Sequence, residues 1–439
     1  MIAATATWTG TYALPASAAP VAIVVQAHGG TASVSLGPGH SGATSVTFEM
    51  KGARVHFAFP GLPQKLAFEG AIKGPRLTGT VRQGRLRGTF TLRRGLSRLL
   101  PLLGAYRSAA GGEAAIVEPE GVPAVLVEFP SGATHGIGPG LSVGDRLGDT
   151  TGNGAIVPDA TGFSWHGMHY TRVGLRQQEV RVGLDAATLT LPPGSGRFPA
   201  VAMVHGSGRS TRDEFDVFTA YFALHGVAVL ADDKRGVGQS GGRYPGDVAS
   251  DATIDVLARD AQAEVRFLAK LPQVDSKRVG LWGDSQGGWI VPLAASRERA
   301  VRWAILNSGP TVTVGESDDW AALAGQSQSP PTGTRAAMLA QVRGDGPSGF
   351  DPLPALRTLS IPVLWMYGSD DRNVPIELCI ERLSGLNTTQ DFSWVLLPTT
   401  HTPLVLPTGL LSSLPQSPGF DPRFFPAVAD WLRRKGIAG

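Results

Sequence analysis

Cysteine is almost absent from this chain of 439 residues, because Cys379 is the only one. A single thiol excludes a disulfide framework and a metal site built on several cysteines, and it fits either redox environment. No stretch approaches the roughly 18 to 20 apolar residues of a membrane-spanning helix, so we expect no membrane span. The segment from Met1 to Thr11 lacks the pattern of a secretory signal. A cytoplasmic location is the default, or a secreted one if a leader has been removed.

Charged residues are also scarce, at 17% of the chain, whereas apolar residues make up 42%. This composition indicates a folded globular protein, and the length allows more than one core. The net charge of +3 hides an asymmetry, because residues 1–110 carry three lysines and nine arginines against two glutamates. This basic segment either docks on the acidic remainder, attracts an anionic ligand or only presents solvated arginines. Because no aromatic residues are interleaved with the arginines, we expect no nucleic-acid binding.

The N-terminal part of the sequence contains short runs of alternating apolar and polar residues separated by glycine, which indicate antiparallel strands. The clearest is a hairpin in which residues 77–81 and 86–92 alternate around a turn at Gln83-Gly84. We predict an antiparallel β domain over residues 1–106 and a β-rich bridging segment over residues 107–178. No repeat of fixed period is present, which argues against a propeller or a solenoid.

From residue 179 onward, apolar strands alternate with helical patterns, and this predicts an α/β domain over residues 179–439. Repeated β-α units form a mostly parallel sheet with helices on both faces, and such sheets carry their chemistry at the carboxyl ends of the strands. We predict strands at 199–204, 227–231, 279–282, 304–307, 363–367 and 394–397, and helices at 214–225, 251–271, 376–386 and 424–435.

One serine lies between a predicted strand and a predicted helix, in the string Gly283-Asp284-Ser285-Gln286-Gly287-Gly288. This is the context of a G-x-S-x-G nucleophile elbow. The strained turn needs small residues two positions on either side of Ser285, because a side chain there would strike the neighbouring strand or helix. We therefore predict Ser285 as a nucleophile.

A serine hydroxyl needs a base, and His401 is the only histidine beyond residue 225. It follows the strand predicted at 394–397, so it should lie near the elbow. The acid that orients the histidine should follow another strand, and Asp370 and Asp371 follow the one at 363–367. We prefer Asp371 because of its spacing to the next helix, and Asp370 remains the alternative as a turn or capping residue.

The negative charge of an acyl-transfer transition state needs hydrogen-bond donors. His205-Gly206-Ser207-Gly208 follows the strand at 199–204, and we predict that the backbone N–H groups of Ser207 and Gln286 form an oxyanion hole. His205 is expected to be structural. Trp289 is predicted either to line the substrate pocket or to lie in the core.

These strings, together with Asp233-Lys234-Arg235-Gly236-Val237-Gly238-Gln239-Ser240, make residues 179–439 resemble the α/β-hydrolase superfamily. Within it the chain is most similar to bacterial serine esterases and acyl hydrolases with an N-terminal β-rich extension. The resemblance implies hydrolysis of a small-molecule acyl ester through an acyl-enzyme, with no cofactor and no metal. It implies a structural role for Arg235 in its loop. Asp284 stands where histidine is frequent, which leaves the chemistry intact and the subfamily undetermined.

Two alternatives remain open at this point. The same three residues would serve a peptidase or an acyl-thioester hydrolase, since these reactions differ only in the leaving group and the pocket. A binding protein with a vestigial triad is the alternative of another class. Residues 311–358 lie between two core strands and are predicted to form a small lid. The sequence carries no indication of the oligomeric state.

Overall fold

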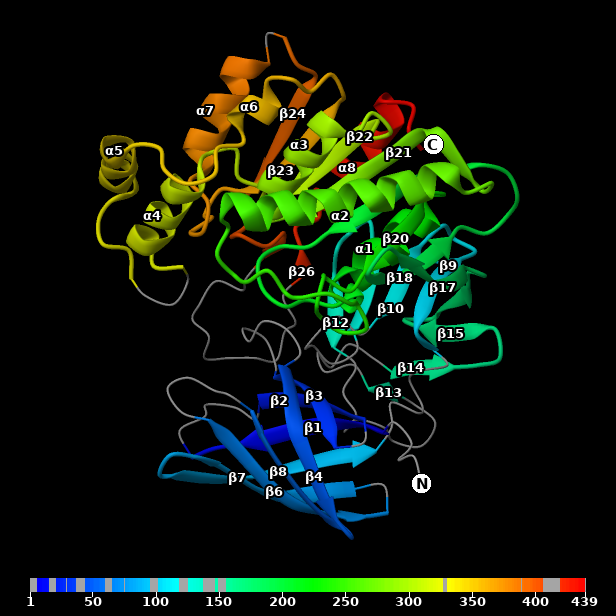
Figure 1. Ribbon diagram of the computed structural model, residues 1–439. Coiled ribbons are helices and arrows are strands. Elements are labelled where there is room, and N and C mark those ends of the chain that lie inside the picture. The colour runs from blue at the N-terminus through cyan, green and yellow to red at the C-terminus, as the bar shows by residue number, and fades with distance from the viewer. Residues whose placement is uncertain are drawn as a thin grey trace. The chain divides into compact units, whose positions relative to one another are not determined.

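The structure is a computed structural model, and its chain divides into two compact units (Figure 1). The β unit comprises residues 1–128, 134–173 and 407–417, and the α/β unit comprises residues 129–133, 174–406 and 418–439. The units interleave along the chain, and the division at residues 106 and 178 stays a prediction. The structure describes residues 6–15, 21–28, 30–36, 44–59, 65–74, 76–94, 102–117, 125–136, 147–148, 155–326, 330–387, 389–405 and 419–438.

The first eight strands of the β unit form a closed antiparallel barrel, in which β1 pairs with both β2 and β8. Alternate residues point inward and fill the barrel with aromatic rings, as in the stacked pair Phe57 and Phe68, whose centroids lie 4.6 Å apart. The strands are β1 (Ala6–Ala13), β2 (Val21–His28), β3 (Thr31–Leu36), β4 (Thr44–Lys51), β5 (Arg54–Phe59), β6 (Leu66–Lys73), β7 (Arg76–Gln83) and β8 (Leu86–Arg94).

The predicted hairpin is present as β7 and β8, with Leu77, Val81, Phe90 and Leu92 buried. The alternation over residues 86–92 also predicts Leu86 on this buried face, and for Leu86 the prediction is wrong. It is 38% exposed because it is the first residue of β8, directly after the turn.

The rest of the β unit is an eight-stranded sheet with its own small core around Tyr106 and Phe163. Its strand order is β12-β11-β10-β9-β16-β15-β14-β13. Ala124, the first residue of one predicted strand, lies outside the described residues. The strands are β9 (Gly104–Ser108), β10 (Glu113–Val117), β11 (Val125–Phe129), β12 (Thr134–Gly136), β13 (Leu147–Gly148), β14 (Ala155–Pro158), β15 (Gly162–Trp165) and β16 (Met168–Arg172).

The α/β unit contains the predicted mostly parallel sheet, in the order β17-β18-β20-β19-β21-β22-β23-β24. The strands from β20 to β24 along this order run parallel, and β17 and β18 are antiparallel additions at one edge. They are β17 (Arg176–Val182), β18 (Asp185–Leu191), β19 (Phe198–Val204), β20 (Ala228–Asp232), β21 (Val274–Asp284), β22 (Trp303–Asn307), β23 (Val363–Gly368) and β24 (Phe392–Leu397); a separate short pair is β25 (Leu404–Val405) and β26 (Gly419–Phe420).

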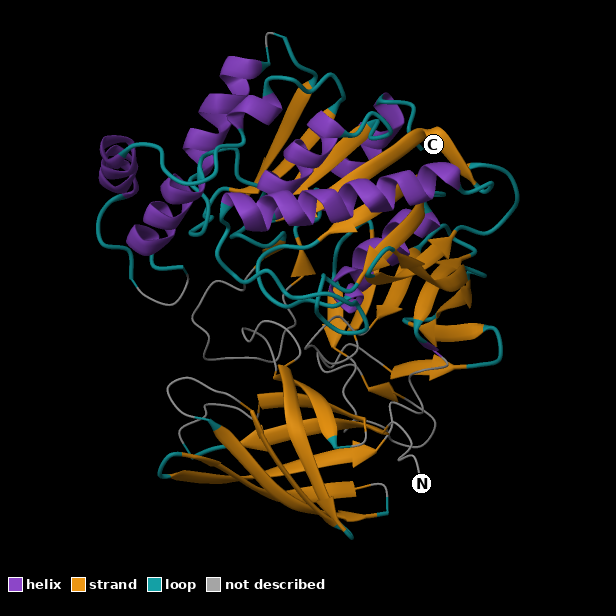
Figure 2. Ribbon diagram, viewed as in Figure 1, coloured by secondary structure: helices purple, strands orange, loops and turns teal. Residues whose placement is uncertain are grey.

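Helices cover both faces of this sheet (Figure 2). On one face, α2 and α3 pack on β21, and on the other α1 and α8 surround the Trp282 indole with aromatic rings. None of the helices within the described ranges is long and apolar enough to cross a membrane. The helices are α1 (Asp216–Leu224), α2 (Asp251–Lys270), α3 (Gly287–Arg297), α4 (Val314–Ala324), α5 (Arg335–Asp345), α6 (Leu353–Leu356), α7 (Ile376–Leu386) and α8 (Phe424–Arg434), with a 3₁₀ turn at Arg212–Phe215.

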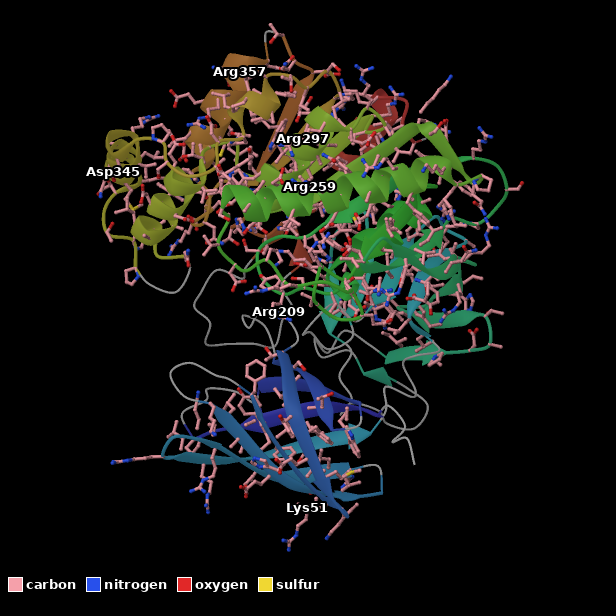
Figure 3. All side chains as sticks on the ribbon, viewed as in Figure 1. Lys51, Arg209, Arg259, Arg297, Asp345 and Arg357 are labelled. Atoms are coloured by element: carbon pink, nitrogen blue, oxygen red, sulfur yellow. The ribbon has the colours of Figure 1, made fainter. Side chains whose placement is uncertain are left out.

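Helix α2 illustrates why these segments are helical. The Ser250 side chain caps its first turn by accepting from the Thr253 N–H, and apolar residues recur every three or four positions on the buried face. On the exposed side of these helices lie Arg259 of α2 and Arg297 of α3, both labelled in Figure 3. Both arginines bind the Asp255 carboxylate. The pair between Arg297 and Asp255 joins α2 to α3, the helix that begins beside the nucleophile elbow.

Candidate active site

Ser285 stands in a strained turn between β21 and α3. Its φ of +47° is a left-handed conformation that few residues with a side chain adopt. The turn is held by the Ser285 N–H, which donates to the Asn307 carbonyl of β22 at 2.9 Å. This geometry lifts the hydroxyl out of the sheet at the carboxyl end of β21.

Glycines on both sides of Ser285 make the turn possible, but the one on the helix side is not at the position that the motif predicts. A Cβ on Gly283 would lie 2.8 Å from both the Leu306 and Val291 side chains. One on Gly287 would come no closer than 3.3 Å to the Val204 carbonyl oxygen, whereas one on Gly288 would lie 2.4 Å from the Pro310 nitrogen. The tighter constraint on the helix side is therefore Gly288, where α3 crosses the loop after β22.

The structure brings Ser285, His401 and Asp371 into one hydrogen-bonded chain. His401 Nε2 lies 2.8 Å from Ser285 Oγ, and His401 Nδ1 lies 2.9 Å from Asp371 Oδ2. The other oxygen, Asp371 Oδ1, accepts the N–H groups of Asn373 and Val374 at 2.7 and 2.9 Å. The Asp371 side chain is fully buried, whereas Asp370 is exposed, so the buried carboxylate is the one that faces the imidazole.

The surroundings of His401 favour its charged form. Burial lowers the pKa of His401, but the Asp371 carboxylate and, at longer range, Asp284 outweigh it, and the pKa is raised above its usual value. An imidazole in this setting can take a proton from Ser285 and hold it as a stabilised imidazolium.

Asp284, one residue before the serine, carries a second, half-buried carboxyl beside the site. Its Oδ1 accepts from Asn307 Nδ2 at 2.5 Å. Burial raises the pKa of Asp284 to about 6, with the nearby Glu214 adding to the effect.

The loop after β19 lies against the nucleophile. A Cβ on Gly206 would lie 3.3 Å from Ser285 Cβ, which is a tight contact, so the loop passes close to the nucleophile. Ser207 follows directly and is exposed, and Gln286 follows Ser285 at the start of α3 and is buried. Ser207 and Gln286, the two predicted oxyanion donors, therefore each follow a residue of this close approach, Gly206 and Ser285.

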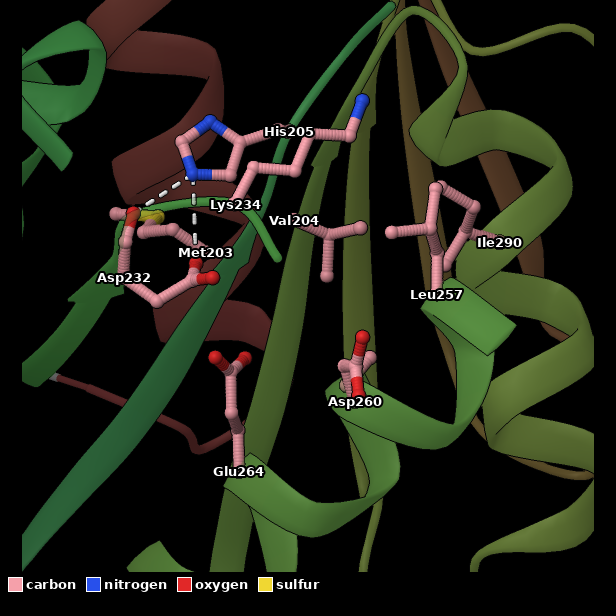
Figure 4. A pocket seen from close by; sticks show the side chains of 10 residues that line it. Met203, Val204, His205, Asp232, Lys234, Leu257, Asp260, Glu264 and Ile290 are labelled. Atoms are coloured by element: carbon pink, nitrogen blue, oxygen red, sulfur yellow. Dashed lines mark hydrogen bonds and ion pairs between the residues drawn. The ribbon is translucent and has the colours of Figure 1, made fainter. Parts of the chain in front are cut away.

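His205 occupies a buried polar cluster behind this loop (Figure 4). Its Nδ1 lies 2.8 Å from Glu214 Oε2, and its Nε2 donates to the Asp232 carbonyl at 2.7 Å. Burial lowers the pKa of His205, but the carboxylates of Asp232 and Glu214 outweigh it and raise the pKa to about 10. His205 is thus positively charged, and its hydrogen bonds connect the end of β19 to β20 and to the turn before α1.

The segment 311–358 adds contacts that sequence reasoning did not find. The Trp320 indole, fully buried in α4, donates to the Asp371 carbonyl at 3.2 Å, and Ser317 Oγ donates to the Asn373 carbonyl at 3.0 Å. Arg335 of α5 lies over the Trp320 ring and pairs with Glu377 of α7. The segment therefore braces the loop that holds Asp371, and its action as a lid stays a prediction.

Trp289 is 6% exposed and lies in the hydrophobic core, where its Nε1 donates to the Val312 carbonyl at 2.8 Å. In the part of the chain that the structure describes, no three His, Cys, Asp or Glu side chains cluster as metal ligands would.

The parallel sheet covered on both faces, with a serine elbow at the end of its fifth strand, defines the class of protein. The α/β unit has the α/β-hydrolase fold that its motifs suggested, and a large β-rich region precedes it in the chain.

Comparisons with known proteins agree with this class. Residues 198–341 match the family model Hydrolase_4, described as serine aminopeptidase, S33. Mouse acyl-coenzyme A thioesterase 5 is 31% identical over 156 residues, which are 34% of this chain and 32% of the relative. A Penicillium polyketide transferase is 29% identical over 192 residues, 41% of this chain and 64% of the relative. The chain thus spans about a third of the length of the thioesterase that it matches.

Among solved structures, an esterase of Pyrococcus furiosus is 19% identical and covers 60% of this chain and 93% of its own, with a TM-score of 0.41. An acylaminoacyl peptidase of Pyrococcus horikoshii is 13% identical and covers 92% of this chain and 74% of its own, with a TM-score of 0.42.

Proposed function

We propose that the protein is a serine carboxylesterase that cleaves small acyl esters through an acyl-enzyme. Ser285 is the nucleophile, His401 the general base and acid, and Asp371 the residue that orients the imidazole. The observation that carries the proposal is the unbroken chain of hydrogen bonds from the Asp371 carboxylate through His401 to Ser285 Oγ, on a serine with positive φ. A serine held this way is activated only if its proton has somewhere to go, and His401 Nε2 is 2.8 Å away.

In the first half-reaction, Ser285 Oγ attacks the ester carbonyl carbon while its proton passes to His401 Nε2. The carbonyl oxygen becomes an oxyanion, which the N–H groups of Ser207 and Gln286 stabilise. The tetrahedral intermediate collapses, the C–O bond to the alcohol breaks, and His401 returns the proton to the departing alkoxide. Water then attacks the acyl-enzyme with His401 again as base, and the acid is released with Ser285 regenerated.

The test is steady-state hydrolysis of 4-nitrophenyl acetate by the purified chain and by Ser285→Ala. Removing the nucleophile should lower kcat by a factor on the order of 10⁴ or more, since only binding and the oxyanion donors remain. The exposed Ser276 offers a matched control, and Ser276→Ala should keep kcat within twofold. Equal turnover by wild type and Ser285→Ala would refute the proposal.

Thioester hydrolysis is the second candidate, favoured by the similarity to mouse acyl-coenzyme A thioesterase 5. The chemistry is the same up to the leaving group, so the pocket decides between the two. We expect a higher kcat/KM on the aryl ester than on an acetyl thioester of coenzyme A or on a blocked dipeptide amide. The reverse order would assign the chain as a thioesterase or a peptidase.

A further inference from the structure

Lys234 is a buried lysine beneath the loop that carries Ser207. It follows β20 and is 3% exposed. Its Nζ donates to three acceptors: the Gly206 carbonyl at 2.7 Å, the Gly208 carbonyl at 3.1 Å and Gln286 Oε1 at 3.1 Å. An ammonium has three N–H donors, so all of them are used. Figure 4 shows this amino group turned away from the carboxylates of Asp260 and Glu264, which line the same cavity.

The bond to Gly206 acts on the peptide group of a predicted oxyanion donor. The Gly206 carbonyl and the Ser207 N–H belong to one planar trans peptide, so they point in opposite directions. An ammonium that holds the oxygen from below therefore fixes the direction of the N–H above. It also draws electrons toward the oxygen and makes the N–H a stronger donor, as in hydrogen bonds that polarise one another. The bond to Gly208 fixes the far side of the same loop.

The bond to Gln286 ties in the residue that carries the other predicted donor. Because lysine only donates, the Gln286 amide must turn its oxygen toward Nζ, and this fixes the side-chain orientation. One ammonium thus joins the loop after β19 to the first residue after the nucleophile. These two segments come from different strands, and their spacing sets the width of the oxyanion site.

We propose that Lys234 is a positioning residue that holds both halves of the oxyanion site in place and polarises the Gly206–Ser207 peptide. It acts through the Gly206–Ser207 peptide and the Gln286 side chain and does not touch the substrate. The proposal rests on the hydrolase function proposed above, and it assigns a role to the second position of the Asp233-to-Ser240 loop string.

Titratable and charged groups of both signs surround Lys234. Burial lowers the pKa of Lys234 to about 8, while Glu214, Asp232 and Asp247 oppose that change. The Tyr244 ring lies 5.8 Å from Nζ, and the cations His205 and Arg209 and the carboxylates of Asp260 and Glu264 complete the surroundings. Lys234 is therefore charged at neutral pH and becomes neutral as the pH rises through about 8.

The first test compares Lys234→Met with Lys277→Met, a control on an exposed lysine of the same unit. Loss of one oxyanion donor typically costs about 10²–10³ in kcat, so misplacing such donors should lower kcat by about 10 to 100-fold. KM should change less than threefold, because an oxyanion site acts on the transition state and not on the bound ester. Lys277→Met should match wild type. A Lys234→Met variant with kcat within twofold of wild type, or with the loss confined to KM, would overturn the assignment.

The second test needs no variant that loses the charge. The wild-type kcat should fall at least threefold as the pH rises from 7 to 9, because neutral Lys234 keeps only two of its three donors. In Lys234→Arg the guanidinium stays charged, so kcat should be level over this range, even if its neutral value is lower. This comparison carries the test when Lys234→Met does not fold. A wild-type kcat that is level from pH 7 to 9, or an equal fall in both proteins over this range, would overturn the proposal.

Labelling by a fluorophosphonate distinguishes a wrong ester substrate from a wrong hydrolase function. A wild type that reacts with the probe but cleaves no ester would refute the ester substrate, and the labelling rate of Lys234→Met would then test the positioning role with the same expected loss. A wild type that neither reacts nor turns over would refute the hydrolase function and the role of Lys234 together.

Discussion

One oxygen of the Asp371 carboxylate accepts hydrogen bonds from two backbone N–H groups of its own loop. The other oxygen lies 2.9 Å from His401 Nδ1. The carboxylate is therefore aimed before any substrate arrives, and the imidazole tautomer follows from it. Asp371→Asn should lower kcat by about 10²–10⁴-fold, because an amide that donates to Nδ1 selects the wrong tautomer. Steady-state kinetics on 4-nitrophenyl acetate measures this.

The neighbouring carboxylate supplies the control for that experiment. Asp370 is exposed, and Asp370→Asn should leave kcat within twofold of wild type. If Asp370→Asn were the more damaging change, the acid would have been assigned to the wrong residue.

The pH dependence of kcat/KM should report His401 in the free enzyme. Neutral imidazole is the base, so activity is absent while His401 is protonated and rises as the pH passes its pKa, which lies above the usual 6.5. Asp284 contributes to that raised pKa. Asp284→Asn removes a negative charge that favours the imidazolium, so the acid limb should move to lower pH. A shift to higher pH would contradict this account of the site's charges.

The buried ion pair between His205 and Glu214 should make stability depend on pH. The folded-state pKa of His205, about 10, exceeds the unfolded value near 6.5. The stabilisation is therefore fully present below about pH 6.5 and is lost as the pH rises through about 10. His205→Gln should lower the free energy of unfolding by about 3 kcal/mol at neutral pH. In urea titrations, the difference in the free energy of unfolding between wild type and His205→Gln should shrink toward pH 10. A difference that grew with pH would contradict the stabilising charge on His205.

Two glycines of the α/β unit offer a matched pair for packing at the elbow. Gly288→Ala would place a Cβ 2.4 Å from the Pro310 nitrogen, so it should cost about 1 to 3 kcal/mol of stability. Gly385 in α7 has nothing within 4 Å of the same position, and Gly385→Ala should stabilise by up to about 1 kcal/mol through helix propensity. Thermal unfolding of the two variants measures both effects. Equal behaviour would mean that the crossing at Pro310 is looser than described.

Much of the α/β unit could be predicted because its strands are short apolar runs that end at glycine or polar residues. Helix α7 was predicted over the same residues that it occupies, 376–386. Strand β21 was predicted to begin at Val279 and begins at Val274, since its first residues include Asp275 and the exposed Lys277 and carry no apolar run. Local pattern finds the buried part of a strand and misses the part that runs into solvent.

Other features depend on contacts between distant residues and were not visible in the sequence. The barrel closes because β1 pairs with β8, some 80 residues later, and no local pattern encodes that pairing. Trp320 reaches the Asp371 loop from about 50 residues away. Lys234 was visible only as the variable position of a loop motif, and its three acceptors lie at positions 206, 208 and 286. The elbow and the candidate triad were predictable because each follows the end of a strand.

The claim on which the account depends is that the Ser285 hydroxyl is activated by His401. Intact-mass analysis after treatment with a fluorophosphonate tests it most directly, with peptide mapping to locate the adduct. We predict a single adduct on Ser285, its absence in Ser285→Ala, and labelling at least 100-fold slower in His401→Ala. A protein left unmodified, as expected of a binding protein with a vestigial triad, or modified at another serine, would contradict the account.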